Sequence, residues 1–252
     1  MIRNAVIEAF NISGNEAVME KIIDGRLVLI KYFTRKGYVS ISGKYSIVGK
    51  YCFSFCDFIE ELTFEEGVEY IEERIICGKA SLKKVDFPAS LNAISYDAFR
   101  DCGNLQEVIF KNKRTMLSSL VFDNTAWLNG FDDEFVVING HLIRYNGKAE
   151  NIVIPEGVTE IEHYLFCGND RIKTLACPDS LKIIGAGAFS DCKNLEKISL
   201  NDNLEVIAPE AFSCCKSLKE VILPDGINAV GFGAFDLPDV NIIVRKNSSI
   251  YD

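Results

Sequence analysis

Residues 82–102 read LKKVDFPASLNAISYDAFRDC, and this pattern recurs along most of the chain. Its Phe99 marks a position that is aromatic or aliphatic in eight units spaced 23 residues apart, except for one interval of 44. A fixed period in the twenties indicates a solenoid, in which each unit is one coil that buries its apolar side chains only against neighbouring coils. The eight positions are Phe53, Ile76, Phe99, Phe122, Phe166, Phe189, Phe212 and Phe235.

Each coil is expected to contain two short extended runs and a corner. Residues 85–87 alternate inward, outward and inward, as a strand does, and Pro88 ends the run because proline has no N–H to donate to a ladder. A second extended run, residues 91–94, leads to the Ala98-Phe99 corner. We therefore predict a mainly β repeat solenoid: a leucine-rich repeat stack of eight coils of about 23 residues with short parallel strands, interrupted by a β-hairpin.

The interval of 44 residues contains the hairpin signal. Asn139-Gly140 separates two apolar runs and favours a type I′ turn, and Asp24-Gly25 marks a matching hairpin near the start. We expect the chain to form one continuous solenoid in two similar blocks. The expected segments are a cap or frayed segment over 1–16, a hairpin plus four coils over 17–128, a hairpin plus four coils over 129–245, and a tail over 246–252.

The pattern LxxVxLPxxLxxIxxxAFxxC resembles the leucine-rich repeats of the BspA type, also called the Treponema type. The segments that carry the resemblance are LEKISLNDNLEVIAPEAFSCC, LKEVILPDGINAVGFGAFDLP and LKIIGAGAFSDC, and the resemblance covers about residues 20–240. Members of this family are often bacterial cell-surface proteins proposed to bind host proteins or other bacteria. The resemblance therefore implies the repeat fold and an adhesin-like module, and it brings no catalytic residues.

Charge and hydropathy exclude several classes of partner. The net charge is −9, and no Lys/Arg run resembles a phosphate-binding stripe, so we expect no nucleic acid partner. No apolar run reaches the roughly 18 residues of a membrane helix, so we expect no membrane insertion. The N-terminal residues do not read as a secretory signal. The sequence as given thus predicts a cytoplasmic protein, or a cell-surface or secreted one if a leader was removed.

Patterns that would support catalysis or metal binding are missing from the sequence. There is no CxxC, GxSxG, GxGxxG or P-loop motif, and the two histidines, His141 and His163, are expected on the surface. Structural zinc needs four convergent ligands, which nothing here supplies. We therefore predict that the chain is not an enzyme and has neither a cofactor nor a metal site.

The nine cysteines are an odd number, which favours free thiols. Four of them, Cys56, Cys102, Cys192 and Cys215, share one corner position, where we expect small buried side chains. A disulfide between Cys192 and Cys215 is the alternative, because adjacent coils lie within the Cα range of such a bond. In the vicinal pair, we expect Cys214 to point outward and Cys215 inward.

The outward side chains of the first strands offer a recognition face. The central column is partly apolar and includes Ile109, Val153 and Ile222, and the column beside it mixes charges. Strand propensity alone also accounts for the apolar column, and a solvated charge ladder accounts for the other. The predicted binding residues are Ile109, Val153, Ile222, Glu107, Lys197, Glu220 and Trp127.

Trp127, the only tryptophan, is expected either to pack the hairpin onto the stack or to anchor a partner. The function we predict is a non-enzymatic protein-binding scaffold that uses the strand face. The alternative is a carbohydrate-binding or cell-surface polymer-binding module using Trp127, Tyr145 and Tyr164. A further hypothesis is end-to-end stacking with another copy, which Arg245 and Lys246 would oppose. The oligomeric state is left open.

Overall fold

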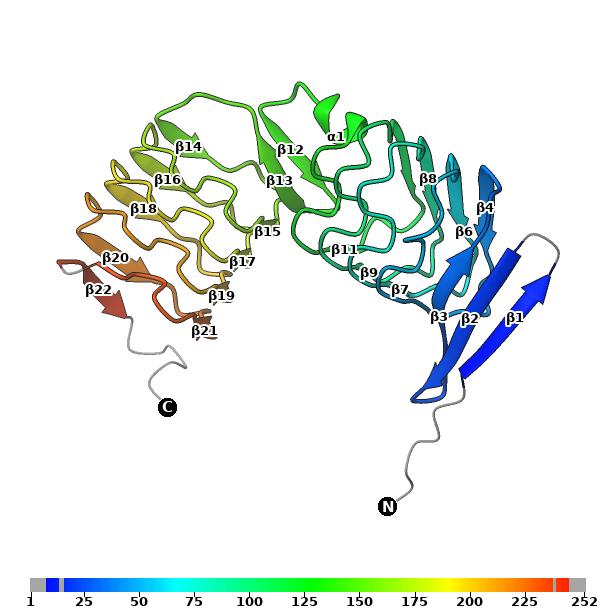
Figure 1. Cartoon of the computed structure of the whole chain (residues 1–252). Helices are drawn as coiled ribbons and strands as arrows, with labels where there is room; N and C mark the ends of the chain where they lie inside the picture. The colour runs from blue at the N-terminus through cyan, green and yellow to red at the C-terminus, as the bar shows by residue number, and fades with distance from the viewer. Residues whose placement is uncertain (1–7, 14–15, 238, 245–252) are drawn as a thin grey trace, which may run out of the picture. The chain divides into compact units, whose positions relative to one another are not determined.

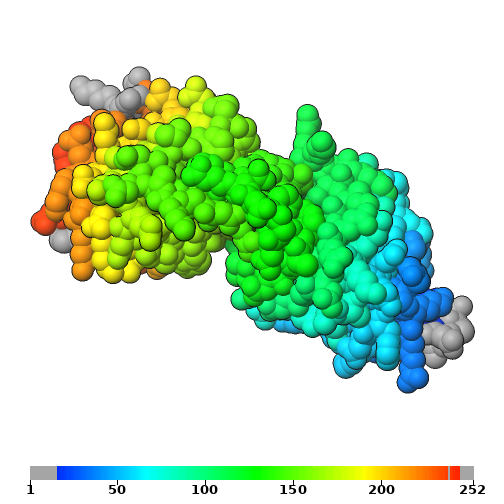
Figure 2. All heavy atoms as spheres, turned by 90° about the horizontal axis from the view of Figure 1, so that it is seen from above, coloured from blue at the N-terminus to red at the C-terminus, as the bar shows by residue number. Residues whose placement is uncertain are grey.

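The computed structural model describes residues 8–13, 16–237 and 239–244. The chain divides into two compact units, residues 1–131 and 132–252, and each is a stack of coils with parallel strands (Figure 1). Coils follow one another in chain order within each unit, as the colour bands of Figure 2 show. Over these described ranges the coils total about nine, because a final strand opens one coil beyond the eight predicted. The mainly β solenoid predicted from the sequence is thus confirmed.

The N-terminal unit begins with three antiparallel strands, β1 (Glu8–Ser13), β2 (Glu16–Ile23) and β3 (Arg26–Phe33). The first strands of its coils form a four-stranded parallel sheet of β4 (Tyr38–Ile41), β6 (Glu61–Phe64), β8 (Lys84–Phe87) and β10 (Glu107–Phe110). The second strands continue from β3 as β5 (Ile47–Val48), β7 (Tyr70–Ile71), β9 (Ala93–Ile94) and β11 (Met116–Leu117). The short helix α1 (Ala126–Asn129) follows the last coil.

The C-terminal unit begins with the hairpin β12 (Phe135–Ile138) and β13 (His141–Tyr145). The first strands of its coils are β14 (Asn151–Val153), β16 (Thr174–Ala176), β18 (Lys197–Ser199), β20 (Glu220–Leu223) and β22 (Asn241–Val244). The second strands are β15 (Glu160–Ile161), β17 (Ile183–Ile184), β19 (Val206–Ile207) and β21 (Ala229–Val230), all in one parallel ladder from β13. The strand β22 is the one that opens the ninth coil.

Stacked rings at the repeat position of Phe99 form the core of the coils. In the C-terminal unit, the Phe166 and Phe189 centroids lie 4.8 Å apart, and those of Phe189 and Phe212 lie 5.3 Å apart. Their planes are within 8° and 4° of parallel. This spacing follows from the ladder, because neighbouring strands lie about 4.7–4.9 Å apart and each coil repeats the one before. The half-buried Phe235 ends this column of rings.

Both predicted hairpin turns are confirmed. Asn139 and Gly140 have φ angles of 53° and 85°, and Asp24 and Gly25 have φ angles of 49° and 77°. Positive φ at both central residues defines the type I′ turn, whose twist matches that of the flanking strands.

A left-handed residue recurs at the corner of each coil. Tyr51, Arg74, Asp97 and Leu120 have φ angles of 55°, 52°, 56° and 59°, at intervals of 23 residues. A non-glycine residue in this region costs roughly 1–2 kcal/mol. Backbone hydrogen bonds between adjacent coils compensate for this cost, because bonds such as the one from Phe53 N to Ile75 O (2.9 Å) join each corner to the next. Side chains at this position are therefore held in fixed directions.

Some expectations fall outside the described residues. The predicted tail 246–252, with Arg245 and Lys246, is among these, as are residues 1–7 and 14–15 of the predicted N-terminal segment. Within that segment, β1 pairs with β2. The two-block continuous solenoid stays a prediction. In the part of the chain that the structure describes, no helix has the length and hydropathy to cross a membrane.

Candidate binding surfaces

The residues predicted for the strand face differ in exposure. In the C-terminal unit Val153 is 67% exposed and Ile222 is 47% exposed, so both present apolar surface to solvent. In the N-terminal unit Ile109 is half-buried in β10, opposite Asp86 of β8. Glu107 forms an ion pair with Lys84 of the neighbouring strand at 2.8 Å. Such cross-strand charge pairs are an ordinary means of stabilising a sheet.

The strand face of the C-terminal unit is interrupted between β18 and β20. The first strands form one sheet from β14 to β18 and another from β20 to β22, and no ladder joins them in the described residues. A cleft of about 390 Å³ lies at this break. The residues lining it include Lys197, Glu220 and Ile222, three of the predicted binding residues. Sequence analysis predicted these residues but not the break that brings them together.

The cleft has an apolar floor and a mostly acidic rim. Ile198, Leu200 and Pro224, which are buried or half-buried, supply the floor, and the exposed Ile222 adds an apolar side chain above it. The exposed Glu196, Lys197, Asp202 and Glu220 form the rim. Three carboxylates therefore face one ammonium group.

Below the cleft the coils remain in close contact. A Cβ added at Gly226 would lie 2.4 Å from the backbone oxygen of Asp202. The opening is therefore confined to the strand side of these coils.

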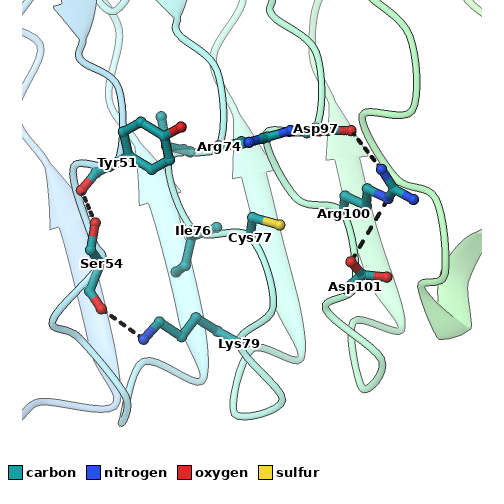
Figure 3. Close-up of a pocket in the computed structure, with 10 residues that line it drawn as sticks. Tyr51, Ser54, Arg74, Ile76, Cys77, Lys79, Asp97, Arg100 and Asp101 are labelled. Carbon is teal, nitrogen blue, oxygen red and sulfur yellow. Dashed lines mark hydrogen bonds and ion pairs between the residues drawn. The ribbon is translucent and has the colours of Figure 1, made fainter.

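A second hollow lies at the corners of the first three coils of the N-terminal unit (Figure 3). Its volume is about 410 Å³. Ile75, Ile76 and Cys77 of the middle coil line it, between Tyr51 on one side and Arg100 on the other. We call it the corner pocket. The pocket was not predicted from the sequence, although Ile76 stands where most coils have phenylalanine.

Paired charges line the corner pocket. Asp97 is only 3% exposed and accepts hydrogen bonds from Arg74 (2.9 and 3.0 Å) and from Arg100 (3.4 Å). The hydrogen bonds that Arg74 donates to Asp97 raise the pKa of Arg74 most, and its hydrogen bond with Tyr51 raises it further. Lys79 donates to the carbonyl of Ser54 (2.8 Å) and pairs with Asp57. The network fixes the positions of all three cationic side chains.

The corner cysteines are buried free thiols, as predicted. Cys192 and Cys215 donate to the carbonyls of Phe166 and Phe189, each at 3.1 Å, so each thiol bonds to the preceding coil. Burial raises the pKa of both thiols to about 12. The alternative of a Cys192–Cys215 disulfide is therefore wrong, and Cys214 is exposed as expected.

The prediction that both histidines lie on the surface is wrong for His141, which is 7% exposed. Its strand β13 pairs with β15, and His141 Nδ1 lies 3.4 Å from a carboxylate oxygen of Glu160. Burial, reinforced by the charge of Glu162, raises the pKa of Glu160 to about 7, and burial lowers the pKa of His141. His163 is half-buried. Among the described residues, no three potential metal ligands gather into a site.

The aromatic residues proposed for glycan binding differ in their surroundings. Trp127, in α1, packs edge-on against Phe122 at 4.9 Å. Tyr145 packs on Phe166, and its hydroxyl accepts a hydrogen bond from the Ala149 amide (3.1 Å). Of the three, Tyr164 is the one classed as exposed. Trp127 and Tyr145 thus serve packing within their own units.

Stacked coils with parallel strands and a core side chain, most often phenylalanine, at the repeated corner position define a leucine-rich repeat solenoid. The family model described as BspA type leucine rich repeat region (6 copies) matches residues 32–135 and 136–249, most of the chain. The chain therefore belongs to the BspA-type leucine-rich repeat family and is a repeat scaffold. No curated protein matches the chain.

Several solved structures are similar to this chain. The pneumococcal vaccine antigen PcpA is 20% identical, with 95% of this chain and 82% of that one covered, at a TM-score of 0.44. A leucine-rich cell-surface protein from Faecalibacterium prausnitzii A2-165 is 16% identical, with coverage of 90% and 86% and a TM-score of 0.40. The T. pallidum leucine-rich repeat protein is 21% identical, with coverage of 84% and 83% and a TM-score of 0.33. Similarities at this level carry no functional argument.

Proposed function

We propose that this chain is a non-enzymatic scaffold that binds a protein partner through the strand face of its C-terminal unit. The cleft between β18 and β20 is the main contact in this proposal. The observation that carries it is that three residues of the predicted recognition face, Lys197, Glu220 and Ile222, line one opening in the sheet. Repeat scaffolds of this kind offer extended surfaces rather than enclosed catalytic sites.

The backbone at the cleft suits an extended segment of a partner. Lys197 N donates to Lys173 O (3.2 Å), and Ser199 O accepts from Cys177 N (2.9 Å), so these groups face β16. Because alternate residues of a strand address opposite neighbours, the amides of Ile198 and Leu200 face the break instead. A partner segment that lies over the cleft can hydrogen-bond to such main-chain groups, and its side chains then meet the lining residues.

The charge of the rim specifies the side chains of the partner. Glu196, Asp202 and Glu220 outnumber Lys197, while Ile222 offers an apolar contact. We infer that the partner presents an apolar side chain flanked by lysine or arginine. Opposite charges at a rim steer association and select the partner more than they add affinity.

A screen of random linear peptides displayed on phage tests this proposal. Wild-type protein is expected to enrich peptides with an apolar residue beside basic residues, and Ile222→Lys and Glu220→Lys are expected to lose this enrichment. The matched control is Phe232→Lys, which changes a 91% exposed apolar side chain of the same unit outside the cleft. Equal enrichment by Ile222→Lys, or no enrichment by the wild type, would refute the proposal.

The glycan alternative through Trp127, Tyr145 and Tyr164 gains no specific support. The first two rings are engaged in packing, and the hydroxyl of Tyr145 is hydrogen-bonded. We therefore place the protein-binding function first.

A further inference from the structure

The corner pocket lies where the middle coil has a smaller core side chain than both neighbouring coils, and a smaller side chain than the following coil at the next position. Ile76 lies between Phe53 and Phe99 in the column of core side chains. One residue further along each coil, Cys77 lies between Ser54 and Arg100. The middle coil thus leaves space that the adjacent coils wall off. The volume of about 410 Å³ is within the range of small-molecule sites.

The polar groups of the pocket are balanced in charge. Three cationic side chains, Arg74, Lys79 and Arg100, each form an ion pair with an aspartate. Arg100 also lies 3.7 Å from Asp101 and 3.6 Å from Asp123. An incoming anion would compete with carboxylates already in place, so the pocket has no net attraction for a charged ligand. It offers donors and acceptors side by side, which hydroxyl groups can match in both roles.

The pocket also has an aromatic wall. Tyr51 is 43% exposed, and its left-handed backbone sets the direction of the ring at the pocket edge (Figure 3). Lys31 Nζ donates to the Tyr51 carbonyl (2.6 Å) and lies 5.8 Å from the ring centroid. An aromatic ring held in this way, beside fixed polar groups, provides an apolar contact for a ligand that is otherwise polar.

We propose that the corner pocket binds a neutral polyhydroxyl ligand, a single saccharide ring, with one face on Tyr51 and its hydroxyls at Arg74, Arg100 and Asp101. Asp97 is buried and holds both arginines, so it is a positioning residue for the donors. The thiol of Cys77 lies at the floor and limits the depth to which the ring enters. This site uses no residue of the strand face and does not depend on that function.

Saturation-transfer NMR on the full chain tests the proposal. The probes are the methyl glycosides of glucose, mannose and galactose, with free glucuronate as the charged comparison. We expect transfer to at least one neutral glycoside with the wild type and with Cys77→Ser, which keeps the space. Cys77→Phe fills the pocket and is expected to weaken binding at least tenfold.

A second variant shows whether a loss of binding by Cys77→Phe comes from the filled pocket or from misfolding. Tyr51→Asn removes the ring and keeps a residue type that tolerates positive φ, so the same loss is expected with an unchanged circular dichroism spectrum. Ile222→Lys is expected to leave glycoside binding unchanged, which separates this site from the strand face. Alkylation of Cys77 is expected to be slower when the glycoside is bound, while the exposed Cys167 reacts at the same rate with and without the glycoside.

Several outcomes would overturn the proposal. They are no transfer to any neutral glycoside at millimolar concentration, undiminished binding by Cys77→Phe, and a tenfold preference for glucuronate over the neutral probes. Beads coated with mannan or dextran, compared with the free glycosides, distinguish a polymer end from a free sugar as the source of the ring. A peptide that occupies the pocket in place of every glycoside would also refute the saccharide assignment.

Discussion

Truncation of Phe189 to alanine tests whether stacked corner rings stabilise the coils. Phe189 is fully buried and lies between two nearly parallel rings, with centroids at 4.8 Å and 5.3 Å. A buried Phe→Ala change costs about 3–5 kcal/mol through lost burial and the cavity it leaves. Phe235 is half-buried and, of the rings that the structure describes, stacks on Phe212 alone. We therefore expect Phe235→Ala to cost about 1–2 kcal/mol, because both the buried area and the number of ring partners are smaller.

Urea unfolding followed by circular dichroism measures both losses. A solenoid can unfold in parts, so hydrogen exchange of residues 174–237 supplies a local reading of the same change. The expected order is a larger loss for Phe189→Ala, with faster exchange in the coils on both sides of it. An equal loss for the two variants, or a loss below about 1 kcal/mol for Phe189→Ala, would refute the stacking argument.

Three further substitutions probe separate features. Glu160→Gln removes a carboxyl group whose pKa is raised from 4.5 to about 7. Because the folded state holds this proton more tightly, the contribution to stability is fully present below pH 4.5 and is lost as the pH rises through 7. Over this pH range the free energy of unfolding of the wild type should fall by about 1–2 kcal/mol relative to that of the variant, after allowance for solvent screening. If the melting temperatures of the two proteins changed in parallel with pH, this expectation would be refuted. Gly43→Ala would place a Cβ 1.7 Å from the backbone oxygen of Glu66, so soluble yield and melting temperature should fall sharply, whereas Gly103→Ala, which meets nothing within 4 Å, should be nearly neutral. Asp97→Asn leaves Arg74 without its ionic partner and should destabilise the N-terminal unit by about 1–3 kcal/mol in urea titration; an unchanged midpoint would contradict the buried network.

Features that depend on a single coil were predictable from the sequence. The period of 23 residues located Phe99 and its counterparts, and Asn139-Gly140 located the turn, because each rests on local patterns that every coil repeats. The burial of His141 was missed because it depends on β15, a strand formed from residues 160–161, which contributes the carboxylate of Glu160.

The two hollows depend on contrasts between coils. The corner pocket follows from Ile76 between two phenylalanines and from Cys77 beside the larger Arg100, and a column-by-column comparison of side-chain size contained that signal. The break between β18 and β20 has no such signal, because Lys197–Ser199 and Glu220–Leu223 show the same alternation of exposed and buried residues as the first strand Asn151–Val153. Pairing between coils is a tertiary property, so the residues of the cleft could be named while the cleft could not.

At the left-handed corner positions, the conformation of the backbone is independent of the identity of the side chain. Every coil bends there in the same way, whether the residue is Tyr164, Glu210, Gly187 or Gly233. Glycine adopts this backbone without strain, so a larger side chain at this point lowers stability unless its contacts compensate. For protein engineering, the column is a row of attachment points: a new side chain can be introduced at one coil without redirecting the backbone of the next. Substitution of each member by glycine would then report, coil by coil, which side chains contribute to stability and which are available for binding.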